Sequence, residues 1–181
     1  MIRIFYYLFL LSISSFSIVI IIIVSILWRY GNSLPDYKQL KSYKPPMVSR
    51  LYTQDGKLLE EYSVENRVYI PISAVPKTVI EAFLVTEDKN FYKHEGIDFK
   101  GVSRAIIHNL INIIKDKRLV GASTITQQVA KNFLLSNEVS FERKIKEALL
   151  ALRIERTLSK DKILELYLNE IFLGFRSYGI V

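Results

Sequence analysis

The stretch SFERKIKEALLALRIERTLSKDKILELYLNEIFLG, residues 140–174, has the periodicity of two consecutive amphipathic helices. Ser140 is placed to cap the first helix and Ser159 the second, because short hydroxyl side chains favour helix N-termini. Apolar residues recur at helical spacing in both halves: Ile145, Leu149 and Leu152, then Ile163, Tyr167 and Ile171. This stretch therefore predicts a mainly α-helical domain.

The helical pattern extends upstream as far as Ser73. Pro76 suits a first helical turn. Apolar residues continue the pattern in two groups: Val79, Phe83 and Leu84, then Val102, Ala105, Ile106, Leu110 and Ile113. We therefore expect the helical domain to cover residues 73–181.

A short β region precedes the helices. Asp55-Gly56 is a strong turn signal, and it stands between two runs rich in leucine and tyrosine. Residues 67–70 are a candidate third strand, ended by Pro71. The pattern predicts a β-hairpin region over residues 47–72.

The N-terminal segment from Ile4 to Trp28 contains no charge, no proline and no glycine. A helix of this length can cross a bilayer, which needs about 20 apolar residues. A cleaved signal peptide fits less well, because its apolar run has about 7–15 residues and a small-x-small site follows it. We predict a cytoplasmic tail at residues 1–3, a single transmembrane helix at 4–29 and a linker at 30–46.

The charges that flank this apolar segment bear on its orientation. Only Arg3 precedes it, whereas Arg29, Lys38, Lys41 and Lys44 follow it. The positive-inside rule, taken alone, would keep the rest of the chain in the cytoplasm. Long domains translocate despite their charge, so the motifs described below carry more weight for the predicted side.

Composition limits the classes of function. The formal net charge of +7 suits an anionic partner: nucleic acid, an anionic membrane surface or a phosphorylated substrate. The sequence contains no cysteine, which excludes disulfides, thiolate catalysis and zinc–thiolate sites. Basic residues are interleaved with acidic ones and follow an apolar anchor, which disfavours a nucleic-acid role.

Two clusters of functional residues follow the hairpin. EDKNFYKHEG, residues 87–96, begins with two acids at the end of an apolar helix, and aromatic residues, a histidine and a glycine follow them. GASTITQQVAKN, residues 121–132, places hydroxyls and amides at a helix start, where N–H groups bind phosphate or sugar oxygens. A solvated helix end and an ordinary N-cap would also explain them. No second histidine follows His94 at a metal-binding spacing, and His108 lies in an apolar stretch, so no histidine metal site is expected.

Two further clusters lie in the helices first quoted. RKIKEALLALRIE, residues 143–155, places Arg143, Lys144 and Glu147 on one helical face. A surface ion-pair ladder would explain the same spacing. ILELYLNEIFLG, residues 163–174, would by itself be a packed amphipathic helix.

The segment between the first two clusters is apolar around most of its circumference. Its apolar residues are Ile106, Ile107, Leu110, Ile111, Ile113 and Ile114. Such a helix is usually buried in a core or in lipid. Lys115, Lys117 and Arg118 follow at once, which favours a helix that dips into an anionic membrane surface.

In this order the four clusters resemble the successive motifs of glycosyltransferase family 51, and the resemblance covers about residues 30–181. The Asp55-Gly56 hairpin and TLSKDKILELYLNEIFLGFRSYGI, residues 157–180, look most like the class A penicillin-binding proteins of the 1A type. The resemblance implies a mainly α-helical, lysozyme-like glycosyltransferase domain. It also implies polymerisation of the lipid-linked disaccharide-peptide precursor of peptidoglycan, lipid II, into glycan strands, with inversion at the anomeric carbon.

The resemblance further implies a place and partners. The protein would sit in the bacterial cytoplasmic (inner) membrane as a single-pass protein, with its catalytic part on the extracytoplasmic side. Its partners would be lipid II, the growing glycan strand, membrane lipids and other cell-wall synthesis proteins, and no nucleic acid.

Residue roles follow from the motif match. Glu87 would be the base that deprotonates the acceptor hydroxyl, and Glu147 would act near the diphosphate, directly or through a divalent cation, Mg or Mn. The substrate-binding candidates are Asp88, Phe91, His94, Thr124, Gln128, Lys131, Arg143 and Lys144. Lys131 would bind phosphate. One glutamate beside a basic helix face suits transfer better than hydrolysis, which needs an acid to protonate a sugar alkoxide.

Two features of the family pattern are missing from these 181 residues: the fifth motif, which follows the Tyr-Gly-Ile segment, and the penicillin-binding domain. Ser159 and Lys162 form a Ser-x-x-Lys, but no Ser-x-Asn or Lys-Thr-Gly follows, so we predict a helix cap there. We expect these 181 residues alone to polymerise little or no precursor. Two other interpretations stay open: a lytic, lysozyme-like hydrolase or lyase, and a non-catalytic membrane-anchored binding protein.

Overall fold

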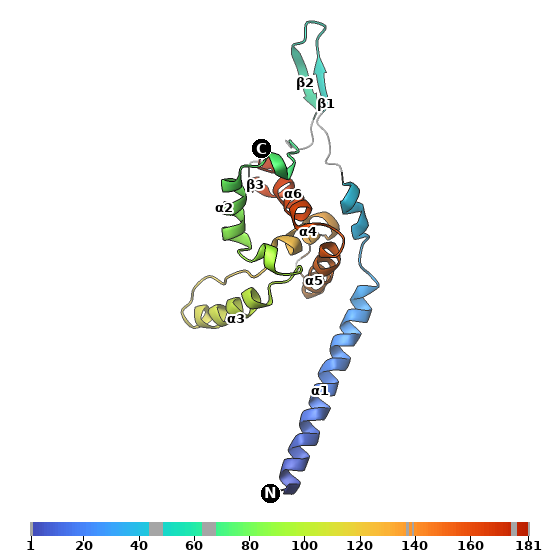
Figure 1. Ribbon diagram of the computed structural model, residues 1–181, viewed down its shortest axis with the longest axis vertical. Coiled ribbons are helices and arrows are strands. Elements are labelled where there is room, and N and C mark those ends of the chain that lie inside the picture. The colour runs from blue at the N-terminus through green and yellow to red at the C-terminus, as the bar shows by residue number, and fades with distance from the viewer. Residues whose placement is uncertain are drawn as a thin grey trace.

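The computed structural model describes residues 2–43, 49–62, 68–136, 138, 140–174 and 177–180. Figure 1 shows a long N-terminal helix, a helical domain and a β-hairpin that projects from the end of the domain opposite to that helix. The α-helices are α1 (Ile2–Gly31), α2 (Lys77–Glu87), α3 (Phe99–Ile114), α4 (Ile125–Leu134), α5 (Phe141–Glu155) and α6 (Lys160–Glu170). The shorter elements are the 3-10 helices η1 (Tyr37–Ser42), η2 (Ile72–Ala74) and η3 (Phe91–Lys93), and the strands β1 (Ser49–Tyr52), β2 (Leu58–Tyr62), β3 (Phe172–Gly174) and β4 (Ser177–Tyr178). The prediction of a mainly helical domain is confirmed.

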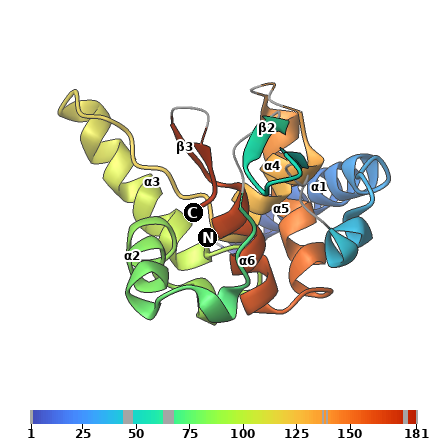
Figure 2. The ribbon, with the colours of Figure 1, turned by 90° about the horizontal axis from the view of Figure 1, so that it is seen from above.

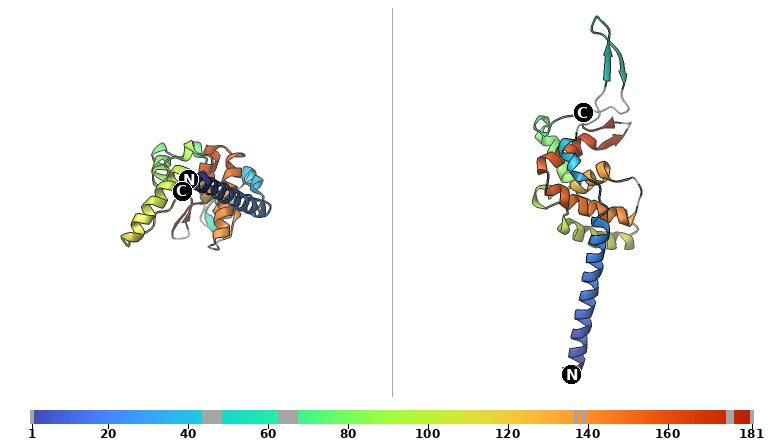
Figure 3. Two further views of the ribbon diagram at one scale, coloured as in Figure 1. Left: turned by 90° about the horizontal axis from the view of Figure 1, so that it is seen from below. Right: turned by 90° about the vertical axis from the view of Figure 1, so that its right-hand side faces the viewer.

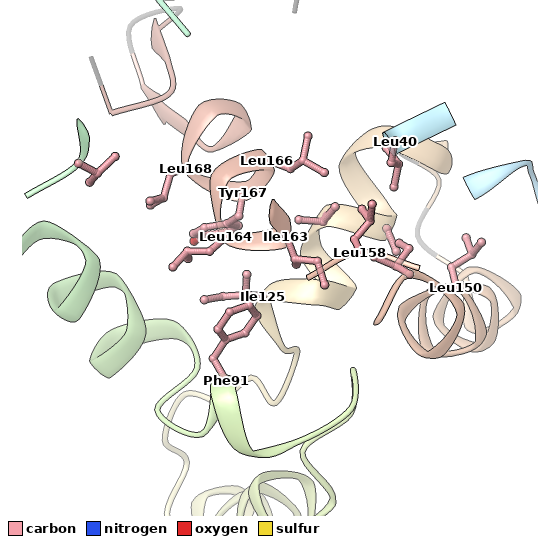
Figure 4. Packing of buried hydrophobic residues seen from close by; sticks show 14 residues of the cluster. Leu40, Phe91, Ile125, Leu150, Leu158, Ile163, Leu164, Leu166, Tyr167 and Leu168 are labelled. Atoms are coloured by element: carbon pink, nitrogen blue, oxygen red, sulfur yellow. The ribbon is translucent and has the colours of Figure 1, made fainter. Parts of the chain in front are cut away.

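Helix α6 forms the centre of the domain. Every residue from Ile163 to Asn169 is buried, as expected for a helix that is surrounded by other elements. Figure 2 shows α6 in the middle, with α2 on one side and α5 on the other. Side chains of α6 meet Ile125 of α4 and Phe91 of η3 in the core (Figure 4). The helices that carry the four sequence clusters are therefore packed around one core.

The predicted helix caps are confirmed. Ser140 Oγ accepts a hydrogen bond from the Arg143 N–H (3.1 Å), and Ser159 Oγ accepts one from the Lys162 N–H (3.3 Å). Ser159 therefore has the structural role that its position at a helix start indicates.

The predicted β-hairpin is also confirmed. β1 and β2 pair antiparallel, and Gly56 in the connecting turn has a positive φ of 76°. The predicted third strand is not formed over residues 68–70, and Arg67 lies outside the described residues. Instead, the Asn169 side chain accepts from the Ile70 N–H and donates to the Ile70 carbonyl, both at 2.8 Å. The Asn169 side chain of α6 thus makes the two backbone hydrogen bonds that a neighbouring strand would have made at Ile70.

The expected linker contains packed structure. Within it, η1 is capped by Asp36, whose side chain accepts from the Lys38 N–H at 2.9 Å. Leu40 in η1 is 2% exposed and belongs to the core of the domain. This segment is therefore docked on the domain as far as Tyr43, and residues 44–46 lie outside the described part of the chain.

Helix α1 is long and apolar enough to cross a membrane. Its candidate span, Phe9–Gly31, has a mean hydropathy of 2.8, and none of it is buried in the protein. Figure 3 shows that α3 lies at the end of the domain from which α1 leaves, whereas the hairpin lies at the other end. A bilayer around α1 would therefore approach α3.

Helix α3 is not a core helix. Ala105 is its only residue among those described that is buried. Seven of its large apolar side chains are exposed, from 43% at Ile111 to 84% at Ile114. Within the described residues, this exposure contradicts the core-helix interpretation of its all-round apolar sequence.

Candidate active site

Glu87 lies at the point where α2 ends and faces the start of α4. Its side chain is exposed, and its Oε2 accepts a hydrogen bond from Gln128 Nε2 at 2.9 Å. Glu87 belongs to the first sequence cluster and Gln128 to the second, so the fold brings these two predicted site residues into direct contact.

Asp88 turns inward, unlike its neighbour Glu87. It is 6% exposed, and its Oδ2 accepts from the Ile125 N–H at 3.1 Å. His94 Nε2 lies 3.0 Å from the same carboxylate, while the Gly96 N–H donates to His94 Nδ1 at 3.2 Å. Since Nδ1 is an acceptor here, Nε2 carries the proton and donates to Asp88. Asp88 and His94 therefore fasten the loop after α2 to the first turn of α4.

The start of α4 is closed by its own cap. Thr124 Oγ1 donates to the Gly96 carbonyl at 2.7 Å and accepts from the Gln127 N–H at 3.2 Å. Gln127 Oε1 accepts from the Thr124 N–H at 3.0 Å, which completes a capping box. With Ile125 bound to Asp88, these N–H groups have protein partners. The capping explanation is therefore confirmed for these backbone N–H groups, and a phosphate contact of this cluster would have to come from a side chain such as Lys131.

Glu147 lies in α5 as part of a charge cluster. It is 2% exposed, its Oε1 is 3.1 Å from Arg143 Nε, and its Oε2 is 2.7 Å from Lys144 Nζ. Lys144 Nζ also donates to Ser123 Oγ at 2.8 Å, which ties α5 to the segment before α4. The predicted sharing of one helical face is confirmed. The pairs are not a surface ladder, because their carboxylate is buried.

Two adjoining pockets meet at Glu87. The pocket of about 510 Å³ contains six charged or amide residues of the site: Glu87, Gln128, Lys131, Arg143, Lys144 and Glu147. The pocket of about 350 Å³ is lined by Glu87, Asp88 and Thr124, together with Arg104 and His108 of α3. Eight of the predicted site residues thus line one or the other pocket.

Phe91 and His94 lie outside these two pockets. Phe91 is 1% exposed in the core, with Lys160 Nζ 4.4 Å from its ring centroid. His94 lines a separate pocket of about 410 Å³ with Glu155 and Lys160. Neither residue therefore lines the two pockets at Glu87: Phe91 belongs to the core, and His94 lines a different pocket.

The sequence interpretation missed two residues of α3. Arg104 and His108 line the pocket of about 350 Å³, although His108 had been placed in an apolar stretch. Gly101, Arg104, Ala105 and His108 all line it and stand at helical spacing on one face. Arg104 and His108, which stand four residues apart on a mostly apolar helix, were the signal that could have found them.

A metal held by protein groups alone does not fit this site. Within the described residues, no group of three His, Asp or Glu side chains is placed to hold an ion. Both oxygens of Glu147 are already paired with cationic side chains. A divalent cation generally needs more oxygen ligands than one occupied carboxylate offers.

These features define a mainly helical domain attached to one apolar helix. Residues 55–181 match the family described as Transglycosylase, and the chain belongs to this family. It is 55% identical over 159 residues to penicillin-binding protein 1A of Rickettsia bellii (strain RML369-C), covering 88% of this chain and 20% of the relative. It is 49% identical over 148 residues to penicillin-binding protein 1A of Aquifex aeolicus (strain VF5), covering 82% of this chain and 20% of that protein. The chain thus spans about a fifth of the length of these relatives.

Proposed function

We propose that this chain is the glycosyltransferase part of an enzyme that polymerises lipid II into peptidoglycan glycan strands, with inversion at the anomeric carbon. One observation carries the proposal: a single pocket joins a solvent-accessible carboxylate, Glu87, to the cations Lys131, Arg143 and Lys144 of two other helices. The pairing of a base with a basic wall is what transfer from a diphosphate to a hydroxyl requires.

Glu87 is the proposed base. A sugar hydroxyl is a weak nucleophile, so removal of its proton in the transition state is worth about 10²–10⁴-fold in rate. The exposed carboxylate can reach a hydroxyl in either pocket, and the Gln128 amide orients it. The proton passes from the acceptor 4-hydroxyl to a Glu87 oxygen as that hydroxyl attacks the anomeric carbon of the donor.

The three cations that line this pocket, Lys131, Arg143 and Lys144, are the proposed diphosphate site. A diphosphate leaves as an anion, so its departure needs positive charge more than a proton. Lys131 and Lys144 extend from α4 and α5 into the pocket of about 510 Å³. Glu147 holds Arg143 and Lys144 in place through its two ion pairs. The divalent cation expected from the resemblance has no support from the donor set, and no step of this mechanism uses one.

The membrane is the proposed location, with the domain on the extracytoplasmic side. Helix α1 supports a single-pass anchor, and the exposed apolar side chains of α3 support contact with lipid. Lys115, Lys117 and Arg118 follow α3 and would meet anionic headgroups. Since α3 also lines a pocket next to Glu87, a lipid-linked precursor could reach the site without leaving the bilayer.

The test is Glu87→Gln in the natural protein that carries these residues. We expect polymerisation of lipid II to fall by at least about 10²-fold while the circular dichroism spectrum stays unchanged. Glu81→Gln is the matched control, because Glu81 is an exposed glutamate in the same helix and should be silent. Polymerisation by Glu87→Gln at a rate close to that of the unmodified protein would refute the proposed base.

A further inference from the structure

Tyr167 has a buried hydroxyl group that lacks a partner. The residue is 1% exposed in the middle of α6, and no hydrogen-bond partner for its hydroxyl exists among the described residues. Leaving a buried hydroxyl unpaired costs about 1–3 kcal/mol by the usual estimate, and a phenylalanine would avoid that cost. A functional role for the hydroxyl would explain why position 167 holds tyrosine and not phenylalanine.

The position of Tyr167 beside α2 points to such a role. Its ring packs edge-on against Phe83 of α2, with the ring centroids 6.1 Å apart. Phe83 lies four residues before Glu87, so both project from one face of α2, one turn apart. Figure 4 shows Tyr167 beside Leu164 on the side of α6 that faces α2. The ring thus packs against α2 one helical turn before Glu87.

The electrostatics of Tyr167 agree with this placement. Burial raises the pKa of Tyr167 above its ordinary value, and the negative charge of Glu87 raises it further. The hydroxyl therefore stays protonated over the whole physiological range and can only act toward a carboxylate as a donor.

We propose that Tyr167 is a positioning residue for Glu87, whose hydroxyl donates a hydrogen bond to the Glu87 carboxylate when that side chain turns inward to take the acceptor proton. The inference rests on the proposed role of Glu87 as the base. In the present state Glu87 Oε2 is bound to Gln128 Nε2. Gln128 and Tyr167 would together hold one carboxylate oxygen from two sides and leave the other oxygen free for the acceptor hydroxyl.

The proposed hydrogen bond between Tyr167 and Glu87 should affect how the polymerisation rate depends on pH. A hydrogen bond donated to a carboxylate favours its charged form, so the base would stay ionised to lower pH. Removing the hydroxyl should move the acid limb of the rate profile to higher pH. Other charged or titratable groups share the two pockets with Glu87: Asp88, Lys89, Asp98, Arg104, His108, Lys131, Arg143, Lys144 and Glu147. Each measurement is repeated in a His108→Gln background, so that the histidine in the same pocket cannot account for a shift of the profile.

The experiment compares Tyr167→Phe with the unmodified natural protein. The rate of lipid II polymerisation is measured for both from about pH 5 to about pH 9. We expect the acid limb to move upward by about 0.4–1 pH unit, which is the size of one hydrogen bond. At the acid end, the rate relative to that at high pH should fall by about 3- to 10-fold. Tyr92→Phe is the matched control, because Tyr92 is an exposed tyrosine whose hydroxyl bonds to Asp161, away from Glu87.

A measurement of stability separates this role from a structural one. Because the hydroxyl has no partner in the present state, the thermal midpoint of Tyr167→Phe should equal or exceed that of the unmodified protein. Superimposable pH profiles, or a midpoint lowered by several degrees, would overturn the proposal. Full activity of Glu87→Gln would overturn the proposed function as well, whereas an inactive Glu87→Gln beside an unshifted Tyr167→Phe would refute the positioning role alone.

Discussion

At the scale of single residues, Gly96 decides how closely the loop after α2 can approach α5. Its φ is 93°, in the left-handed region that side chains disfavour. A Cβ atom at this position would lie 2.8 Å from the carbonyl carbon and oxygen of Ala151. The same residue donates to His94 and accepts from Thr124. One glycine therefore joins the first cluster to both α4 and α5.

Gly96→Ala should be strongly destabilising. The left-handed conformation costs a side chain about 1–2 kcal/mol, and overpacking against the Ala151 backbone adds about 1–3 kcal/mol. We expect the free energy of unfolding to fall by about 2–5 kcal/mol in denaturant titration. Gly121→Ala is the matched control, because no atom lies within 4 Å of a Cβ there, and it should be close to neutral. Equal stability of the two variants would contradict this account of Gly96.

Glu165 is a second residue on which several contacts depend. Its Oε2 accepts from the Ile72 N–H at 2.9 Å, and its Oε1 accepts from Lys162 Nζ at 2.6 Å and from the Tyr69 hydroxyl. Burial opposes ionisation, but the hydrogen bonds from Lys162 and Tyr69 outweigh it and hold the pKa of Glu165 below its ordinary value of 4.5. This carboxylate and Asn169 together fasten the segment from Tyr69 to Ile72 onto α6.

Glu165→Gln should destabilise the protein in a pH-dependent way. Because the pKa of Glu165 is lower in the folded state, its contribution to stability is present above about pH 4.5 and is lost as the pH falls through the folded-state value. The variant should lose about 1–3 kcal/mol near neutral pH and converge with the unmodified protein in acid. The exposed Glu142, paired with Lys146, gives the control Glu142→Gln, with an expected loss below about 1 kcal/mol. A constant gap between variant and unmodified protein down to low pH would be contrary evidence.

At the scale of elements, the apolar helix α3 and the basic loop after it are held together as one unit. The Asn109 side chain donates to the Val120 carbonyl and accepts from the Val120 N–H, at 3.0 and 2.7 Å. Asn112 Nδ2 donates to the Arg118 carbonyl at 3.1 Å, and Asp116 takes a left-handed conformation with φ 49° just after the helix. Two asparagines therefore fold the basic loop back along the helix and keep its charges beside the exposed isoleucines.

This unit should enter the lipid headgroup region when α1 spans a membrane. The chain has no cysteine, so one spin label can be placed at Ile111→Cys on α3 or at Asp55→Cys on the distant hairpin. In nanodiscs with anionic lipid, the label at position 111 should collide more with dissolved oxygen than with a water-soluble nickel chelate. The label at position 55 should show the reverse. Neutral lipid should weaken the contact at 111, and equal water access at both positions would exclude membrane contact by α3.

The sequence predicted those elements whose signals are local. Ser140, Ser159 and the Asp55-Gly56 turn act within a few residues of themselves, and the structure confirms all three. The missing third strand near Ile70 shows the limit, because its hydrogen-bond partner is Asn169, which is 99 residues away. His108 was missed for a related reason: only the packing of α3 reveals that one side of an apolar helix lines a pocket.

At the scale of the whole molecule, Arg153 and the segment that follows α1 hold the anchor against the domain. Arg153 Nη2 of α5 donates to the Gly31 carbonyl at the end of α1, at 3.0 Å. A cation at a helix C-terminus satisfies an unpaired carbonyl and interacts favourably with the helix dipole. Nine residues on, Leu40 of η1 is buried in the core. Because α5 also carries Glu147, the direction of α1 sets how the charged pocket faces the membrane.

Arg153→Met should loosen the anchor without unfolding the domain. A hydrogen bond to a charged group contributes about 1.5–3 kcal/mol, so its loss should raise the undocked population at least about tenfold. Spin labels at Ser25→Cys in α1 and Glu142→Cys in α5 report the angle between the two helices as a distance distribution. We expect one narrow distribution in the unmodified protein and a broad one in Arg153→Met, with unchanged circular dichroism. Arg156→Met is the control, because Arg156 is an exposed arginine just past the end of the same helix, and its distribution should stay narrow. A narrow distribution in Arg153→Met would mean that the packing of the segment after α1, in which Leu40 is buried in the core, is enough to hold α1 in place.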